Sequence, residues 1–230
     1  MQIMKGHPYF KIRSFSTLRE MLWQSVDLYH DKVAFRYREQ PGGDLLVKTY
    51  GEFKQEIQNL GTALQALGLN GCRLAVVGEN SYTWCLAHAT MVCGAGVAVP
   101  LDRLLPAEEI ISLLDRGNVD VVFYDPSYHA ALMTAAAAQP RLRALICLRP
   151  SRFGREPAPA WDKPTHQLLA QDNPDEQNPA CKLLVLDDLL KWGAQLRANG
   201  DEAFDRVAID PGALMALLYT SGTTSTSKAV

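Results

Sequence analysis

The chain has 230 residues, of which 47% are hydrophobic and 21% charged, and its formal net charge at pH 7 is −2. The length is ample for a proper core in one large domain or two small ones, and the composition is ordinary for a soluble globular protein. The near-neutral charge, with no basic stripe, argues against a nucleic-acid-binding protein.

Helical and strand patterns alternate near the N-terminus. In residues 17–29 the apolar side chains recur at helical spacing, which predicts an amphipathic helix. Two short runs, residues 33–38 and 45–49, flank the turn-forming sequence Pro41-Gly42-Gly43, so they predict two strands joined by a turn.

A second helix is predicted to begin at a capping box. Thr49 is followed three residues later by Glu52, and in such a pair each side chain accepts a hydrogen bond from the other residue's backbone N–H. Apolar residues at helical intervals follow. Gly68 is placed to end this helix as the residue that takes the left-handed conformation.

From residue 74 onward, short apolar runs alternate with helical segments. This order predicts the fold class α/β, with a doubly wound, mostly parallel sheet covered by helices on both faces. The predicted strands are residues 74–77, 97–99, 119–124 and 144–148, and regular structure is predicted to resume at 183–186. The predicted helices are residues 81–93, 107–116, 128–138 and 187–198.

Two further segments complete the chain. Residues 150–180 hold six of the 13 prolines, many charges and few large apolar residues, so they predict an irregular excursion and not a domain boundary. Residues 213–219 are an apolar run that predicts a buried strand. With the loop that follows, this strand forms the segment 213–230, and we interpret the whole chain, residues 1–230, as part of one domain.

The cysteines and the N-terminus bear on the compartment. The N-terminus lacks the apolar region of a secretory signal, and the longest apolar window is too short and too interrupted to span a bilayer. The cysteines are odd in number and lack a C-x-x-C pair, which favours free thiols in a reducing cytoplasm. They are Cys72, Cys85, Cys93, Cys147 and Cys181.

The last twelve residues, Y-T-S-G-T-T-S-T-S-K-A-V, are the most informative part of the chain. Phosphate oxygens need many hydrogen-bond donors, a backbone that can approach closely and a positive charge, and this loop supplies hydroxyls, Gly222 and Lys228. A Walker A loop is disfavoured, because it would need a glycine before the lysine and Ser or Thr after it. Here Ser227 precedes Lys228 and Ala229 follows it.

This loop resembles the phosphate loop of the adenylate-forming superfamily, Y-T-S-G-T-T-G-x-P-K-G-V, with Ser225, Ser227 and Ala229 as the departures. Residues 93–102, C-G-A-G-V-A-V-P-L-D, are similar to the family segment K-A-G-G-A-Y-V-P-L-D, and T-Y-G-E-F at 49–53 is similar to T-Y-x-E-L. The order and separation of the three motifs also agree. The departures remove neither the hydroxyls nor the lysine.

A finer resemblance points to one branch. Residues 78–84, G-E-N-S-Y-T-W, are similar to the G-E-N-x-x-E-W segment of long-chain fatty acyl-CoA synthetases, and the terminal loop looks like that of the bacterial members. The resemblance implies a two-step ligase: a fatty acid or other carboxylate reacts with ATP, with Mg²⁺, to give an acyl-adenylate, and coenzyme A then displaces AMP. An adenylation domain for a different carboxylate is the alternative.

The resemblance also implies the site residues. Binding of the β- and γ-phosphates during the first step would fall to Thr220, Ser221, Gly222, Thr223, Thr224 and Lys228. No catalytic residue and no metal ligand is assigned in this chain, and the five histidines lack metal-ligand spacing. For Gly94, Gly96 and Asp102 a structural role in packing, turns and caps is favoured over ligand contact. His88 is interpreted as a core residue.

The family's later motifs are absent, so we expect the chain to be the N-terminal part of a longer ligase, lacking the C-terminal part of its own fold and inactive alone. The alternative is a non-catalytic nucleotide-binding or interaction module. We expect apolar surface left where the rest would pack, and hence aggregation or non-native dimerisation, a homo-oligomer of that kind. The expected location is cytoplasmic. Peripheral membrane association would suit a fatty-acid enzyme, though no residue here demands it.

Overall fold

The computed structural model describes residues 13–39, 41–148, 181–220 and 228–229. At its centre lies a five-stranded sheet in the order β4-β3-β5-β6-β7, and every neighbouring pair is parallel. The predicted α/β class with a parallel sheet is therefore confirmed. The strands are β3 (Cys72–Val77), β4 (Gly96–Pro100), β5 (Val121–Tyr124), β6 (Ala144–Cys147) and β7 (Lys182–Val185).

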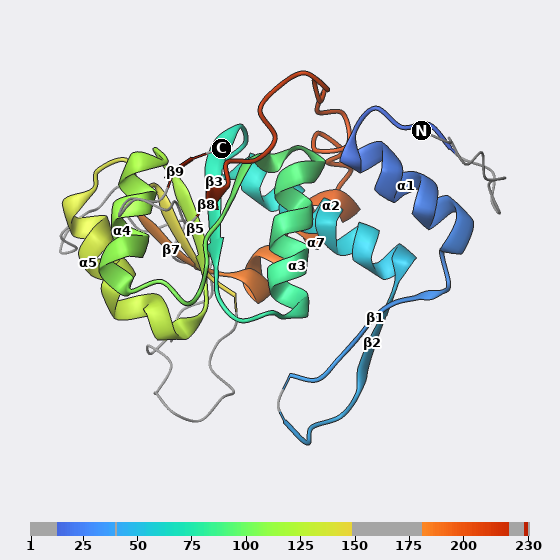
Figure 1. The fold of residues 1–230 in the computed structure, drawn as a ribbon. Coiled ribbons are helices and arrows are strands. Elements are labelled where there is room, and N and C mark those ends of the chain that lie inside the picture. The colour runs from blue at the N-terminus through green and yellow to red at the C-terminus, as the bar shows by residue number, and fades with distance from the viewer. Residues whose placement is uncertain (1–12, 40, 149–180, 221–227, 230) are drawn as a thin grey trace, which may run out of the picture.

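Helices cover both faces of this sheet (Figure 1). Helices α2 (Tyr50–Ala66), α3 (Tyr82–Thr90) and α7 (Leu186–Ala198) pack on one face. The buried side chains between these helices and the sheet are what we call the first core layer. Helices α4 (Ala107–Arg116) and α5 (His129–Ala138) pack on the other face, and the buried side chains between them and the sheet are the second core layer.

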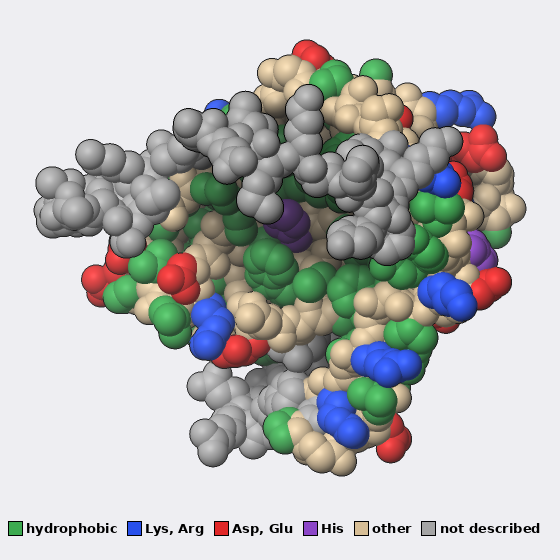
Figure 2. Space-filling model, turned by 45° about the vertical axis from the view of Figure 1, so that its right-hand side comes forward, with side chains coloured by type: hydrophobic (Ala, Val, Ile, Leu, Met, Phe, Trp, Pro, Cys, Tyr) green, Lys and Arg blue, Asp and Glu red, His purple; other side chains and the backbone are tan. Residues whose placement is uncertain are grey.

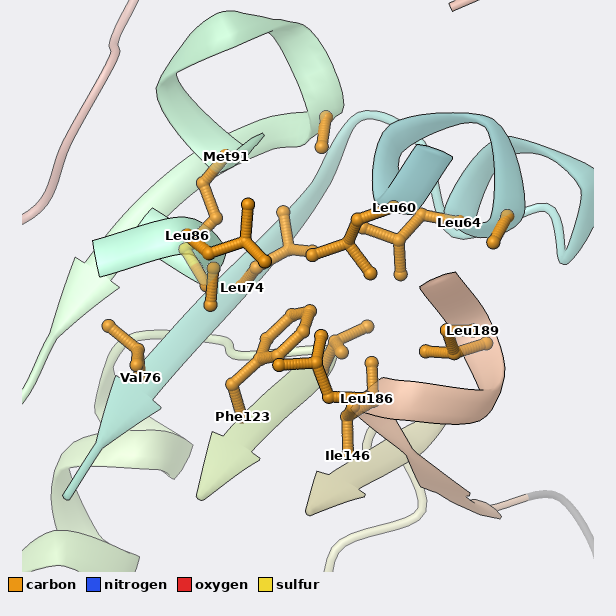
Figure 3. Close-up of a cluster of buried hydrophobic side chains, with 14 of the residues drawn as sticks. Leu60, Leu64, Leu74, Val76, Leu86, Met91, Phe123, Ile146, Leu186 and Leu189 are labelled. Carbon is orange, nitrogen blue, oxygen red and sulfur yellow. The ribbon is translucent and has the colours of Figure 1, made fainter. Parts of the chain in front are cut away.

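The last four residues of strand β3 form an unbroken apolar run. Successive side chains of a strand point to opposite faces, and both faces are covered here. Leu74 and Val76 lie in the first core layer, as Figure 3 shows, whereas Ala75 and Val77 lie in the second. All four side chains are fully buried.

The N-terminal elements agree with their local signals. Helix α1 (Leu18–Tyr29) is capped by Thr17, and β1 (Val33–Tyr37) pairs antiparallel with β2 (Leu46–Thr49). Both hydrogen bonds of the predicted capping box at Thr49 are present. Gly68 follows helix α2 with φ of 69°, the left-handed value that glycine adopts at low cost.

The predicted helix 81–93 ends earlier than expected. Helix α3 stops at Thr90, and a wider turn, Met91–Ala95, leads to β4 through Gly94 at φ of 121°. Arg19 stabilises this turn, since its Nε donates to the carbonyl oxygen of Cys93 at 2.7 Å and its Nη1 to that of Val207 at 2.7 Å. A residue 74 positions away in the sequence thus helps to hold this turn.

The prediction of a buried strand at 213–219 is wrong. This segment makes one isolated parallel bridge, Ala98 to Ala216, and then the short strand β8 (Tyr219–Thr220). Leu214, Met215 and Leu218 are 53%, 46% and 49% exposed, because the segment forms the outer edge of the sheet beside β4. The predicted excursion at 150–180 lies outside the described residues. None of the described helices is long and apolar enough to cross a membrane.

Cys93 provides a test of the packing at this turn. Burial raises the pKa of its thiol to about 12, from an ordinary value of 9.0. Because the pKa is higher in the folded state, folding favours the protonated thiol. The contribution of this preference to the free energy of unfolding is complete below about pH 9 and is lost as the pH rises from 9 toward 12. We expect iodoacetamide at pH 8 to label half-buried Cys85 well before Cys93, as read by peptide mass spectrometry. Equal labelling would contradict the buried placement.

Candidate functional site

The segment before the terminal loop is attached to the sheet at β4. The backbone N–H of Ala98 donates to Met215 O at 2.9 Å, and the N–H of Leu217 donates to Ala98 O at 2.8 Å. Because the segment runs parallel to β4, it carries Thr220 beyond the carboxyl end of that strand. Open α/β sheets bind their ligands outside this end of the strands.

The two ends of the predicted phosphate loop lie opposite each other. Strand β8 pairs antiparallel with β9 (Lys228–Ala229), so that Tyr219 faces Ala229 and Thr220 faces Lys228. Of the six predicted site residues the structure therefore brings Thr220 and Lys228 together through their backbones. The other four, Ser221, Gly222, Thr223 and Thr224, lie outside the described residues.

Tyr219 joins this hairpin to the body of the domain. Its hydroxyl donates to the carbonyl oxygen of Leu113, on helix α4, at 3.0 Å. Its ring packs against the second core layer, and burial raises the pKa of the hydroxyl above its ordinary value. The residue just before the loop is thus held by side-chain contacts as well as by the backbone pairing at Ala98.

Loops that follow three neighbouring strands form a polar network at the same edge of the sheet. Asp125, directly after β5, accepts a hydrogen bond from the backbone N–H of Glu79 at 2.5 Å. Arg103, in the loop after β4, donates to the Glu79 carboxylate at 2.9 Å, and Tyr128 donates to the Arg103 carbonyl at 2.8 Å. These contacts tie together the loops after β3, β4 and β5.

Sequence reasoning gave no functional role to this network. The available signal was the position of each residue just past an apolar strand, since the carboxyl ends of parallel strands meet at one edge. Strand order adds weight, because the chain reverses its winding direction between β3 and β5. Gly78 makes the junction possible: a Cβ there would lie 2.6 Å from the Asp125 carboxyl group.

The structural interpretation of the 93–102 motif is supported. A Cβ on Gly96 would lie 2.1 Å from the backbone oxygen of Cys72, so this glycine allows β3 and β4 to approach. Gly94 takes the turn conformation described above. Asp102 accepts a hydrogen bond from the backbone N–H of Leu104 at 2.9 Å and so closes a local turn.

His88 is half-buried, at the margin of the core and not inside it. Its ring stacks on Trp84 with centroids 5.3 Å apart, and burial lowers the pKa of the imidazole. Figure 2 shows hydrophobic side chains gathered around a hollow on one face of the molecule. Among the described residues, no group of three or more His, Cys, Asp or Glu side chains is arranged to hold a metal ion.

Comparison with known proteins gives a family match and remote relatives. The model of the family described as "AMP-binding enzyme" matches residues 22–230. A chloroplastic long-chain-fatty-acid–[acyl-carrier-protein] ligase of Arabidopsis thaliana is 22% identical over 249 aligned positions, covering 100% of this chain and 31% of the relative. Long chain acyl-CoA synthetase 1 of the same plant is 25% identical over 147 positions, covering 62% of this chain and 22% of the relative.

Solved structures support the fold. The adenylation domain of a carboxylate reductase from Mycobacterium chelonae superposes with a TM-score of 0.71 at 21% identity, covering 93% of this chain and 34% of that one. At this identity the likeness concerns the fold alone. The chain therefore spans no more than about a third of the length of these proteins.

Proposed function

Because the chain belongs to the AMP-binding enzyme family, we propose that it carries the phosphate-binding part of an ATP-dependent acyl ligase. In the first step, a carboxylate oxygen attacks the α-phosphorus of ATP, and the bond to the bridging oxygen breaks, so that pyrophosphate leaves with the electron pair. In the second step, a thiolate attacks the acyl carbonyl, the bond to the AMP oxygen breaks, and AMP leaves.

The observation that carries this proposal is the closure of the hydroxyl-rich loop by a strand pair. Thr220 and Lys228 face each other across β8 and β9, at the carboxyl end of the sheet, where this type of fold binds ligands. In the proposal, Lys228 and the loop donors Thr220, Ser221, Gly222, Thr223 and Thr224 stabilise the negative charge that develops on the departing pyrophosphate.

Mg²⁺ would be held largely by the nucleotide. This ion commonly keeps one or two protein ligands, with phosphate oxygens and waters completing the shell. The loop hydroxyls are oxygen ligands of a suitable kind. Among the described residues, no group of three or more His, Cys, Asp or Glu side chains could hold a metal ion. When bound, the ion would neutralise charge on the phosphates, and the protein's own contribution is to position that charge.

A long-chain fatty acid is the proposed carboxylate, and coenzyme A the proposed thiol. The support is the G-E-N-S-Y-T-W segment at residues 78–84 and the relative named as a long chain acyl-CoA synthetase. A carrier protein is the second candidate acceptor. The specific observation in its favour is the relative named as an acyl-carrier-protein ligase.

Exchange of labelled pyrophosphate into ATP tests the proposal on the complete protein. We expect exchange that depends on hexadecanoate and is weaker with octanoate, benzoate or an amino acid. The adenylate is then offered coenzyme A or a phosphopantetheinyl carrier protein, and the acceptor that consumes it identifies the second step. ATP binding without exchange for any carboxylate would instead favour the non-catalytic module.

A further inference from the structure

The entry to the phosphate loop has two different attachments to the domain. One is the backbone pairing of Met215 and Leu217 with Ala98, at the exposed edge of the sheet. The other is the side chain of Tyr219, which donates to Leu113 O at 3.0 Å across 106 residues of sequence. Leu217 and Tyr219 of this segment pack against the second core layer, and Tyr219 also makes a side-chain hydrogen bond there.

Helix α4 has a feature that accommodates this contact. Its C-terminal residue is followed by Gly117, whose N–H also donates to Leu113 O, at 2.8 Å. A Cβ on Gly117 would lie 2.7 Å from the Tyr219 hydroxyl and 2.9 Å from Leu113 O, closer than a methyl group tolerates. Thus the hydroxyl occupies space that the glycine leaves open.

The Tyr219 hydroxyl remains a hydrogen-bond donor at neutral pH. Burial raises the pKa of Tyr219, so the group stays protonated at neutral pH and donates a second hydrogen bond to Leu113 O, which also accepts from the Gly117 N–H. Leu113 O is one of the last carbonyls of α4, where the helix dipole favours positive partial charge. The contact therefore holds the chain at the position from which the loop begins.

We propose that Tyr219 is a positioning residue for nucleotide phosphates, which acts by fixing the start of the loop relative to helix α4. This inference rests on the proposed function, because it assigns the loop to binding phosphate. It follows that loss of the hydroxyl leaves the loop chemistry intact but lets Thr220 and Lys228 move relative to the sheet. Small displacements of this kind reduce the rate of a step that depends on fixed donors.

Tyr219→Phe in the complete protein tests the role, with the two half-reactions measured separately. We expect adenylation to slow about 3- to 10-fold, the fold-change that one neutral hydrogen bond supplies, and thiol transfer from preformed acyl-adenylate to stay unchanged. A merely structural residue would slow both steps alike. Equal slowing of both, or no change in adenylation, overturns the proposal.

Tyr82→Phe is the matched control. It removes the same atom, from a hydroxyl that donates to Glu56 at 2.5 Å in the cluster beside the β1–β2 hairpin. A hydrogen bond to a carboxylate is at least as strong as one to a carbonyl, so this variant should lose as much thermal stability as Tyr219→Phe. We expect its ratio of adenylation to thiol transfer to equal that of the wild type.

Gly117→Ala disrupts the same hydrogen bond by a change at the end of helix α4. Because the added methyl displaces the Tyr219 hydroxyl, this variant should also slow adenylation selectively. In the double variant with Tyr219→Phe, both changes affect the same hydrogen bond. The combined slowing of adenylation should therefore be smaller than the product of the two single slowings. A full product would contradict a shared contact.

Hydrogen exchange separates this inference from the proposed function. Whether or not the protein forms an adenylate, Tyr219→Phe should speed exchange of the Leu217 amide about 3- to 10-fold, while the amides of β3 stay protected. Absence of adenylation in the wild type together with faster exchange would reject the proposed function but keep the anchoring contact. Unchanged exchange would reject the anchor.

Discussion

Lys228→Ala in the complete protein is expected to slow adenylation by about 10²- to 10³-fold and to slow thiol transfer far less. Negative charge moves onto pyrophosphate only in the first step, and removing one preorganised donor from a developing oxyanion costs about 2.7–4 kcal/mol in comparable sites. In the second step pyrophosphate has left, so the lysine has no charge to stabilise.

Single-turnover measurements of each half-reaction would test this expectation. Lys228→Arg keeps a positive charge but changes its geometry, so it should retain part of the rate. Lys191→Ala is the control, because Lys191 lies exposed on helix α7, 76% accessible and far in sequence from the loop. Equal slowing of both half-reactions in Lys228→Ala would refute the assignment of Lys228 to the phosphates.

Gly193→Ala is expected to destabilise the fold by about 3 kcal/mol, the largest effect on stability that we predict. Glycine-to-alanine changes inside helices normally stabilise by about 0.5–1 kcal/mol, so the sign is reversed here. The reason is the close packing of α7 on α2: a Cβ on Gly193 would lie 1.9 Å from the backbone oxygen of Asn59. A backbone atom cannot rotate away, and therefore the helices must separate.

Thermal and urea unfolding would measure the change. For a chain of this size, a loss of that free energy corresponds to a decrease of roughly 6–12 °C in the Tm. Gln195→Ala, at an exposed position of the same helix, should change stability by less than about 0.5 kcal/mol. A Gly193→Ala protein as stable as the wild type would mean that the two helices lie further apart than the structure places them.

Gly61, on helix α2, offers a graded comparison. A Cβ there would lie 2.4 Å from the ring of Phe204, which is a side chain and can shift. We expect Gly61→Ala to cost less than Gly193→Ala, in the same unfolding experiment. The order of the two effects tests whether backbone contact or side-chain contact dominates the packing of α2.

Most helices and strands were predictable because their signals are local. The capping box at Thr49, the left-handed Gly68 and the acidic first turn of α4 each act within one turn of chain. The unalternated apolar strands predicted a parallel sheet because burial on both faces leaves no polar side. The phosphate-binding prediction for the terminal loop also rests on local sequence, since its hydroxyls, glycine and lysine lie within nine consecutive residues, and it stays a prediction.

The errors fall where distant residues meet. An apolar pattern at 213–219 cannot distinguish a central strand from an edge, so the exposure of Leu214 and Leu218 was not predictable. Arg19 contacts the turn after α3 from a distant helix, and the carboxyl-edge network depends on Glu79 and Arg103 meeting from separate loops. The packing of separate helices and strands decides these contacts, and that packing is not encoded in any single segment.

Residue types and short-range spacing were thus enough to predict the fold class and most helix and strand positions, and they are the basis of the phosphate-binding role that we propose for residues 219–230. Long-range folding was needed to place Tyr219 against Leu113 and to pair Met215 and Leu217 with Ala98. The physical reason is the range of the interactions. Hydrogen bonds within a turn or a capping box involve residues a few positions apart, whereas a binding edge exists only once separate strands have been brought side by side.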